Sequence, residues 1–297
     1  MRVGISLLTL VPGISGGSET YARALTRTLA AEGTLDYRVF LPAIAPDAGG
    51  GLDARVVERY RASRAMPGRI AAMASAALRP GPLRRALELE TLDAVHFPLS
   101  VMLPPVERTP AVTTVLDVQH EAHPEFFSRA ELAYRRRVYG WTVRRSRLVI
   151  TISEHAKEAL VERLGLPADK VRVIYLAVDH DRFSPGTEPR EDFLLYPANP
   201  WPHKNHARLL EAFRLLRQRH PELRLVLTGT GHAEPAPDGV EIAGRVPEAE
   251  LVSLYRRAAA VVFPSLYEGF GQPPLEALAC ATPVACSDIP PLREVCG

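Results

Sequence analysis

The stretch that decides the fold runs Pro264-Ser-Leu-Tyr-Glu-Gly-Phe-Gly-Gln-Pro-Pro-Leu-Glu276. It follows a short apolar run typical of a buried strand and opens a helical segment. Gly269 and Gly271 let the backbone approach a ligand closely, and a helix start offers free N–H donors to an anionic or hydroxyl-rich group. Glu268 and Glu276 flank this turn, so their carboxylates can grip two parts of one polyhydroxylated ligand. A structural turn followed by a surface glutamate would give the same pattern.

Short apolar runs alternate with helical stretches through the first half of the chain. The predicted strands cover 2–8, 37–41, 94–97, 112–116, 148–152 and 171–175, and the predicted helices begin near Ser18 and cover 129–145 and 154–164. This alternation is typical of a parallel sheet whose two faces are covered by helices. The predicted fold class is therefore α/β.

A break in the pattern near residue 180 divides the chain. Segment 179–192 contains two prolines and a glycine among many charges and shows no periodicity, which is typical of a linker. Beyond it the pattern restarts, with strands predicted at 193–196, 224–227, 240–242, 260–263 and 283–286, and helices at 205–219, 248–257 and 274–279. We expect two domains, 1–180 and 181–297, with the ligand in a cleft at the carboxyl ends of their strands.

The composition is that of an ordinary globular protein. Hydrophobic residues make up 46% of the 297 residues, charged residues 24%, and the formal net charge is +2, so nothing global demands a nucleic-acid partner. The longest purely apolar run, 258–263, is far shorter than the roughly 18 residues of a membrane span. The N-terminus opens as a strand without a charged leader. We expect a cytoplasmic protein whose three cysteines are small buried hydrophobes.

Six segments resemble motifs of glycosyltransferase family 4, and they follow one another along the chain in the family's order. Members of that family are retaining enzymes of the GT-B fold, with two Rossmann-like domains. The decisive stretch is similar to the family's E-G-F-G-x-P-x-x-E signature. The other five segments are 16–19 (G-G-S-E), 117–127 (D-x-Q-H followed by P-E-F-F), 151–154 (T-x-S-E), 173–185 and 196–205.

The resemblance implies roles for individual residues in binding a nucleoside-diphosphate sugar. Glu276 would hold the ribose hydroxyls, and Lys204 would bind the diphosphate. Glu268 and the backbone of residues 269–271 would hold the donor sugar. The complete set of implied donor-binding residues is Gly16, Gly17, Asn199, Lys204, Gly229, Val246, Glu268, Gly269, Phe270, Gly271 and Glu276. Many relatives carry an arginine where this chain has Asn199, so more of the phosphate neutralisation would depend on Lys204.

The resemblance also implies the catalytic residues Asp117, His120 and Glu268. Many relatives carry a histidine before the aspartate, where this chain has Leu116, so Asp117 and His120 are the candidates for contacting the sugar. A packed structural histidine would explain His120 equally well. The one D-x-D, at 179–181, lies in the linker, and we expect no metal and no cofactor beyond the GDP- or UDP-linked sugar substrate.

Segment Arg59–Leu87 has an unusual charge pattern, with seven arginines, no acidic residue and interleaved apolar residues. A solvated face of ordinary helices would explain it. The alternative is an interfacial segment on an anionic membrane, placing the protein peripherally at the inner face of the membrane. The expected partners are therefore a nucleotide-sugar donor and a glycan or lipid-linked acceptor, without nucleic acid because aromatic stacking platforms are absent.

Two other functions remain open at this stage. An NAD-dependent oxidoreductase would also use Rossmann-like units, but the first glycine loop lacks a G-x-G-x-x-G. A non-catalytic sugar-nucleotide-binding protein, or an inactive fragment, would keep the fold, and Asn199 and Leu116 are compatible with it. Relatives continue beyond the segment similar to 292–297 with another strand and several helices, so the resemblance implies a truncated second domain.

Overall fold

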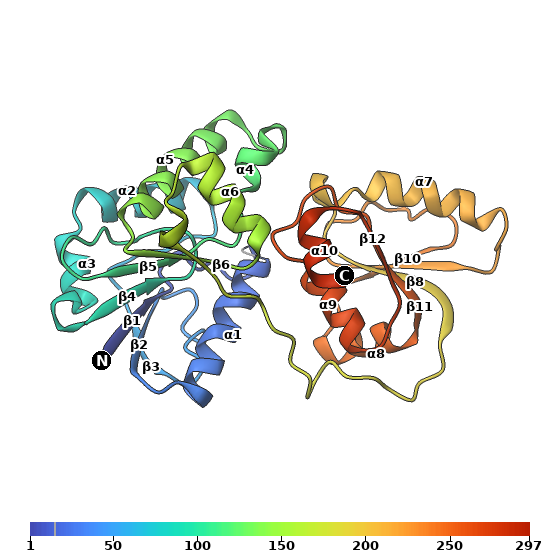
Figure 1. Cartoon of the computed structure of the whole chain (residues 1–297), viewed down its shortest axis with the longest axis horizontal. Helices are drawn as coiled ribbons and strands as arrows, with labels where there is room; N and C mark the ends of the chain where they lie inside the picture. Colours follow the sequence, from blue (N-terminus) through green and yellow to red (C-terminus); the bar gives the residue numbers. More distant parts are fainter. Residues whose placement is uncertain (15) are drawn as a thin grey trace. The chain divides into compact units, whose positions relative to one another are not determined.

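The computed structural model describes residues 1–14 and 16–297, and the side chain of Met66 lies outside this description, as does Ser15. The chain forms two compact units, each built on its own parallel sheet (Figure 1). The first unit comprises Met1–Glu121, Phe127–Thr151 and Lys157–Ile174, and the second comprises Ala122–Phe126, Ile152–Ala156 and Tyr175–Gly297. The α/β class and the two-sheet architecture predicted from the sequence are confirmed.

Seven parallel strands form the sheet of the first unit within the described residues, in the order β3-β2-β1-β4-β5-β6-β7. Their bounds are β1 (Arg2–Ser6), β2 (Asp36–Leu41), β3 (Asp53–Val56), β4 (Ala94–Phe97), β5 (Ala111–Thr114), β6 (Leu148–Thr151) and β7 (Val171–Val173). The interior strands read as apolar runs because helices cover both faces of the sheet.

The helices of this unit pack on opposite faces of its sheet. Their bounds are α1 (Gly17–Glu32), α2 (Met66–Leu78), α3 (Gly81–Ala86), α4 (Gln119–Ala122), α5 (Arg129–Arg145) and α6 (Glu154–Leu164). Helix α1 packs with Ile5 and Val39 in one core cluster, whereas α2 and α3 pack with Phe40 and Val95 in another. Alternate residues of β2 thus serve alternate faces, as the pleat of a strand requires.

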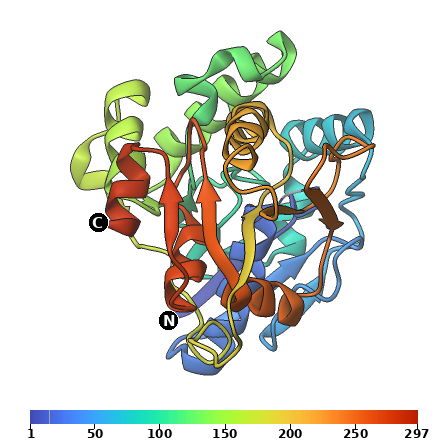
Figure 2. The ribbon, with the colours of Figure 1, turned by 90° about the vertical axis from the view of Figure 1, so that its right-hand side faces the viewer.

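The second unit has a five-stranded parallel sheet within the described residues, in the order β10-β9-β8-β11-β12. Its strands are β8 (Glu191–Pro197), β9 (Arg224–Thr228), β10 (Val240–Gly244), β11 (Ala258–Phe263) and β12 (Val284–Cys286). Figure 2 looks onto this unit and shows β11 and β12 running side by side in the same direction.

The helices of the second unit are α7 (His206–Arg217), α8 (Glu248–Arg257), α9 (Gln272–Ala279) and α10 (Pro290–Cys296). Leu209 and Phe213 of α7 share a core cluster with Leu292 of α10, whereas Tyr255 of α8 and Ala277 of α9 belong to another. The sheet is therefore covered on both faces. Its carboxyl edge leads into the loops that carry the predicted donor-binding residues.

Several elements were not predicted from the sequence, strand β3 and helix α10 among them. Strand β3 was not predicted because all four of its residues are exposed at the sheet edge and two of them are charged, so the apolar signal is absent. Helix α10 was not predicted because it has only seven residues and begins with two prolines. Cys280 is buried as expected, whereas Cys286 and Cys296 are only partly buried. Among the described residues, no helix is both long enough and apolar enough to cross a bilayer.

Candidate functional site

The decisive stretch forms the loop between β11 and α9, and a glycine is required where that loop enters the helix. Gly271 has φ +122°, a conformation that side chains disfavour. A Cβ at this position would also lie 2.6 Å from Cδ2 of Leu292. The backbone at residue 271 therefore lies close to α10, and glycine is needed there because a side chain would collide with Leu292.

The start of α9 differs from the sequence expectation in its hydrogen-bond donors. Pro273 and Pro274 occupy the second and third helical positions and have no N–H. The N–H of Leu275 donates to the carbonyl of Gly271. The two prolines leave Gln272 as the residue of this first turn that can offer an N–H, so recognition depends mainly on side chains and on the loop before Gln272.

Glu276 lies one turn inside α9 and is tied to the adjacent helix. The hydroxyl of Tyr255, a fully buried residue of α8, donates a 2.9 Å hydrogen bond to Oε2 of Glu276. Burial raises the pKa of the Glu276 carboxyl from its ordinary value near 4.5 to about 7, although the hydrogen bonds from Tyr255 and Gln272 oppose the shift. Near pH 7 the Glu276 carboxyl is therefore divided between its protonated and its deprotonated forms.

This raised pKa predicts a pH-dependent stability cost that Glu276→Gln should remove. A carboxyl whose folded pKa is raised stabilises the fold below the unfolded pKa, and that stability is lost as the pH rises through the folded pKa. The free energy of unfolding of the wild-type protein should therefore fall by up to about 3 kcal/mol relative to that of Glu276→Gln between pH 4.5 and 7, which are the ordinary and the raised pKa of this carboxyl. Urea unfolding at pH 5 and pH 8 measures the difference, and equal losses in both proteins would contradict the raised pKa.

Lys204 and Glu268 form a largely buried ion pair. Nζ of Lys204 lies 2.6 Å from Oε1 of Glu268, and the two side chains are only 12% and 11% exposed. The ammonium also lies 4.8 Å from the centroid of the Phe263 ring, a cation–π distance. Two residues predicted to bind neighbouring parts of the donor are thus in direct contact.

Backbone hydrogen bonds hold the lysine segment against the glycine-rich loop. Lys204 ends a short 3₁₀ turn (Pro202–Lys204) just before α7. Its carbonyl accepts a 2.6 Å hydrogen bond from the hydroxyl of Tyr196. The side-chain amide of Asn205 donates to the carbonyl of Pro264, and the amide of Leu266 donates to the carbonyl of His203. Segments sixty residues apart in the sequence are therefore fixed as one surface.

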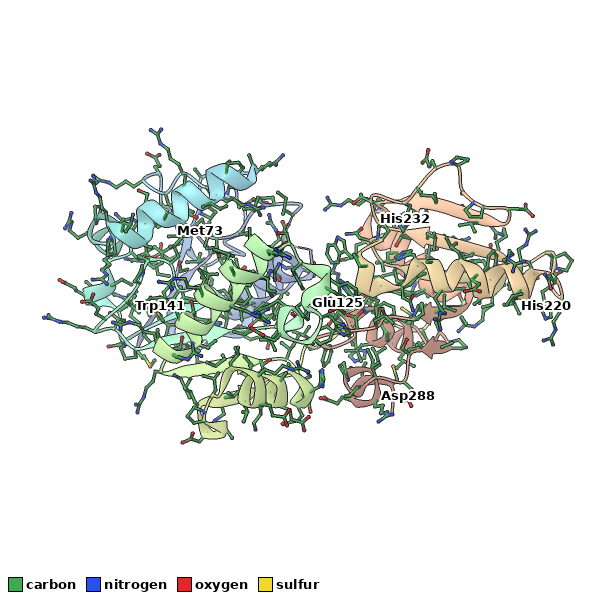
Figure 3. The ribbon with its side chains drawn as sticks, turned by 90° about the horizontal axis from the view of Figure 1, so that it is seen from above. Met73, Glu125, Trp141, His220, His232 and Asp288 are labelled. Atoms are coloured by element: carbon green, nitrogen blue, oxygen red, sulfur yellow. The ribbon has the colours of Figure 1, made fainter. Side chains whose placement is uncertain are left out.

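The two histidines beside Lys204 leave the lysine as the positive charge of this segment. Burial lowers the pKa of both His203 and His206 to about 4, so both are neutral near pH 7. Nε2 of His206 donates to the carbonyl of Ala198 at 3.2 Å, and Nε2 of His232, labelled in Figure 3, donates to the carbonyl of Thr228 at 3.1 Å. His206 and His232 thus hold the loops after β8 and β9 in position.

Asn199 joins those two loops directly. Its Oδ1 accepts a 2.8 Å hydrogen bond from the amide of Thr230. Gly229 has φ +109°, and a Cβ there would lie 2.6 Å from the same Oδ1. The amide of Gly229 also donates to the carbonyl of Gly244, two residues before Val246, which is partly buried against the core. The structure thus joins the loops after β8, β9 and β10, which carry the predicted residues Asn199, Gly229 and Val246.

In the first unit, the glycine loop is tied to the start of α1. Gly16 has φ 51° and precedes the helix, and Gly17 is its first residue with open space where a Cβ would stand. The carboxylate of Glu19 accepts a 2.7 Å hydrogen bond from the amide of Gly13 and pairs with Arg23 at 2.9 Å. Ser15 of this loop lies outside the described residues.

The two acceptor-side candidates have different surroundings. Asp117 is partly exposed, and its Oδ1 accepts a 3.0 Å hydrogen bond from the amide of Gln119. His120 is fully buried, with its ring 5.3 Å from that of Tyr139 and 6.4 Å from that of Phe127. Burial lowers the pKa of His120. Direct contact with a substrate would need this packing to open, so its catalytic role stays a prediction.

Three polar contacts were not predicted from the sequence. In the first unit, Nε2 of His96 lies 2.8 Å from the hydroxyl of Thr114, which lies 3.1 Å from the hydroxyl of Tyr21. Burial lowers the pKa of His96 to about 4. The signal available was a lone histidine in the apolar run 94–97. The Tyr255 contact with Glu276 gave no comparable signal, because a tyrosine at apolar spacing on a helix is typical of core.

The described residues contain no group of three or more His, Cys, Asp or Glu side chains arranged to hold a metal ion. Lys204 supplies a cationic side chain at the predicted diphosphate position, and its Nζ lies 2.6 Å from Oε1 of Glu268.

Similarity to protein families divides along the same two units. The family described as Glycosyltransferase Family 4 matches residues 15–182, and the family described as Glycosyl transferases group 1 matches residues 178–297. The O-antigen chain mannosyltransferase B of Escherichia coli is 30% identical over 214 residues, which cover 63% of this chain and 55% of that protein. The O-antigen chain mannosyltransferase RfbU of Salmonella typhimurium is 32% identical over 191 residues, covering 61% and 53%. The matched part thus spans about half the length of these relatives.

Solved structures resemble nearly the whole chain. The sucrose-phosphate synthase of Thermosynechococcus elongatus aligns with a TM-score of 0.74 at 17% identity, covering 99% of this chain and 83% of that one. WaaG, a glycosyltransferase involved in lipopolysaccharide biosynthesis, aligns with a TM-score of 0.69 at 16% identity and the same coverage. The chain has the GT-B fold. Because the match to the family described as Glycosyltransferase Family 4 covers residues 15–182, over half of the chain, the chain belongs to Glycosyltransferase Family 4.

Proposed function

We propose that the chain is a retaining, metal-independent hexosyltransferase that takes its sugar from a nucleoside-diphosphate donor. The observation that carries this proposal is the buried Lys204–Glu268 ion pair, 2.6 Å long, beside the helix that carries Glu276. In a nucleoside-diphosphate sugar the diphosphate lies between the ribose and the sugar, and the proposal assigns Lys204 to the diphosphate, Glu268 to the sugar and Glu276 to the ribose. Family membership supports the same reading.

Each group has a chemical task in this proposal. The Glu276 carboxylate accepts hydrogen bonds from the two ribose hydroxyls, which a single carboxylate can receive together. The Lys204 ammonium moves from Glu268 to the diphosphate, and the released Glu268 carboxylate accepts hydrogen bonds from sugar hydroxyls. Lys204 and Glu268 therefore each exchange their contact with one another for a contact with a different part of the same ligand.

The reaction step is an exchange of one C–O bond for another at the anomeric carbon. The bond between this carbon and the diphosphate oxygen breaks while the acceptor hydroxyl attacks from the same face, which retains the configuration. The departing phosphate oxygen takes the proton of that hydroxyl. Lys204 stabilises the negative charge that develops on the leaving diphosphate, the role that a preorganised cation performs well. Asp117 and His120 remain the proposed acceptor-side catalytic residues.

Mannose is the proposed sugar, and a glycan or lipid-linked hydroxyl the proposed acceptor. The support is that two relatives at 30% and 32% identity are named O-antigen chain mannosyltransferases. GDP-mannose is accordingly the first donor to test, with UDP-sugars as its competitors.

Calorimetric titration with GDP-mannose, UDP-glucose and NADH distinguishes the candidate functions. The proposal expects saturable binding of one nucleotide sugar, then turnover to the free nucleoside diphosphate with an acceptor present and unchanged rates in EDTA. Magnetic resonance of the product gives its anomeric configuration. An inverted product would refute retention, and NADH binding without sugar-nucleotide binding would refute the whole assignment.

A non-catalytic sugar-nucleotide-binding protein is the second candidate. The observation that favours it is the complete burial of His120, which separates this side chain from any substrate. Binding of a nucleotide sugar without turnover across a panel of acceptors would support this candidate over the transferase.

A further inference from the structure

The outer face of helix α2 is apolar and exposed, and no described residue of the first unit covers it. Ile70 and Leu78 are 54% and 82% exposed, and three alanines of the same helix are exposed with them, Ala71, Ala74 and Ala77. Arg69 is the only charged residue of α2 (Met66–Leu78). A surface helix of a globular protein normally presents charged and polar residues to water, so this apolar face is suited to contact with an apolar partner.

The opposite side of α2 holds the helix firmly on the unit. Ala76 is buried in the core cluster beneath the helix, and Ala72 and Met73 pack against it. Met73, labelled in Figure 3, lies on this inner side, where its sulfur accepts a 3.3 Å hydrogen bond from the hydroxyl of Tyr134 on α5. The exposed apolar face is therefore a fixed surface of a folded unit and does not need to unfold to meet a partner.

Positive charge gathers at both ends of this face. Arg59, Arg61 and Arg64 before the helix, and Arg79 and Arg85 after it, are all exposed. No acidic residue occurs anywhere between positions 59 and 87. Arg84 is engaged elsewhere, because it pairs with Glu107 and donates to the carbonyl of Pro105. The exposed guanidiniums are thus placed to contact anions that border an apolar phase.

We propose that α2 and these five exposed arginines form a docking surface for an anionic lipid bilayer. The helix lies in the plane of the interface, with Ile70 and Leu78 at the boundary of the acyl chains. The arginines at its two ends lie at the depth of the phosphate groups, where long basic side chains place their charge. The small alanines between them allow close approach. Contact of this kind requires no membrane-spanning helix.

This surface lies wholly within the first unit, so the proposal does not depend on the transfer chemistry. It adds a place of action, because a chain held at an anionic bilayer meets lipid-linked hydroxyls in two dimensions.

Flotation of the full chain with lipid vesicles tests the surface. Vesicles of phosphatidylcholine containing phosphatidylglycerol should bind it, pure phosphatidylcholine should bind it far less, and added salt should weaken the binding. The double variant Ile70→Glu with Leu78→Glu should lose at least tenfold of the partition coefficient. The matched control is Leu215→Glu, which changes a leucine 50% exposed on α7 and should bind as wild type does.

A second pair of variants tests the charge. Arg79→Gln with Arg85→Gln should lower partitioning about 30-fold at low salt, at roughly fivefold per arginine. The control pair Arg208→Gln with Arg219→Gln removes equal charge from exposed positions of the second unit and should have little effect. Circular dichroism and nucleotide-sugar titration establish that each variant is folded, and the latter keeps this result separate from the proposed donor site.

Several outcomes would overturn the proposal. Equal binding to both vesicle types, or anionic binding that survives Ile70→Glu with Leu78→Glu, would remove the lipid role of α2. Self-association that the same variant abolishes, without vesicle binding, would identify the face as a contact between protein chains instead.

Discussion

Glu276→Ala is expected to weaken nucleotide-sugar binding about 10- to 100-fold. A carboxylate that accepts hydrogen bonds from two ribose hydroxyls contributes about 1.5–3 kcal/mol, and this variant removes both acceptors. Calorimetric titration of the donor measures the loss. Glu250→Ala is the matched control, because it removes an exposed carboxylate from α8 in the same unit. Equal affinity in Glu276→Ala and wild type would contradict the ribose assignment.

Glu276 should also make donor binding depend on pH. Its pKa of about 7 leaves the carboxyl mostly protonated at pH 6, and the protonated form accepts hydrogen bonds less well. Affinity should therefore fall about tenfold between pH 8 and pH 6. A nucleotide sugar is the right probe, because its diphosphate is esterified at both ends and does not titrate in this range. Glu276→Gln should bind weakly with no such pH dependence, which separates this carboxyl from other titrating groups.

Lys204→Met is expected to weaken donor binding about 10- to 100-fold and to destabilise the second unit. The variant removes the charge that would neutralise the diphosphate, and it leaves Glu268, only 11% exposed, without its partner at 2.6 Å. Stranding a buried carboxylate should lower the free energy of unfolding by about 2–3 kcal/mol. Lys170→Met, which changes a lysine that donates to the carbonyl of Arg144 in the first unit, is the control. Unchanged affinity in Lys204→Met would contradict the diphosphate assignment.

The partner variant Glu268→Gln separates charge from recognition. It frees the Lys204 ammonium, so a nucleoside diphosphate without sugar should bind at least as tightly as to wild type. The preference for the sugar-bearing donor over that diphosphate should fall, because an amide replaces the carboxylate that would hold the sugar hydroxyls. A parallel loss of both ligands would instead mean that Glu268 acts only by positioning Lys204.

The strands of both sheets could be predicted from the sequence, with the exception of the edge strand β3. The buried strands are short apolar runs, and β4 has the predicted bounds of 94–97. Strand β3 carries charges because it lies at an edge, where Arg38 pairs with Asp53, and no apolar pattern marks it. Hydrophobic periodicity reports burial, so an exposed strand held by ion pairs escapes it.

The motifs were enough to propose the donor-side residues, but not to predict the contacts between their side chains. The sequence placed Lys204 and Glu268 in separate segments, and only the structure brings their side chains together. Asn199 was expected among the donor-binding residues, as a hydrogen-bonding side chain that supplies no charge, and only the structure shows that its oxygen accepts a hydrogen bond from the amide of Thr230. Such contacts depend on loop geometry over tens of residues, which no local pattern encodes.

Pro273 and Pro274, which deprive α9 of two N–H donors, also limit the freedom of the chain before folding. Each ring fixes φ near −65°, so the start of α9 has few conformations to lose. Gly271 beside them has the opposite character, and its position against Leu292 is set by the fold alone. A ligand that reaches Glu276 thus meets a helix start that is already ordered. Ordering this segment should therefore cost little conformational entropy on binding, and amide exchange in α9 should slow only modestly when the ligand binds.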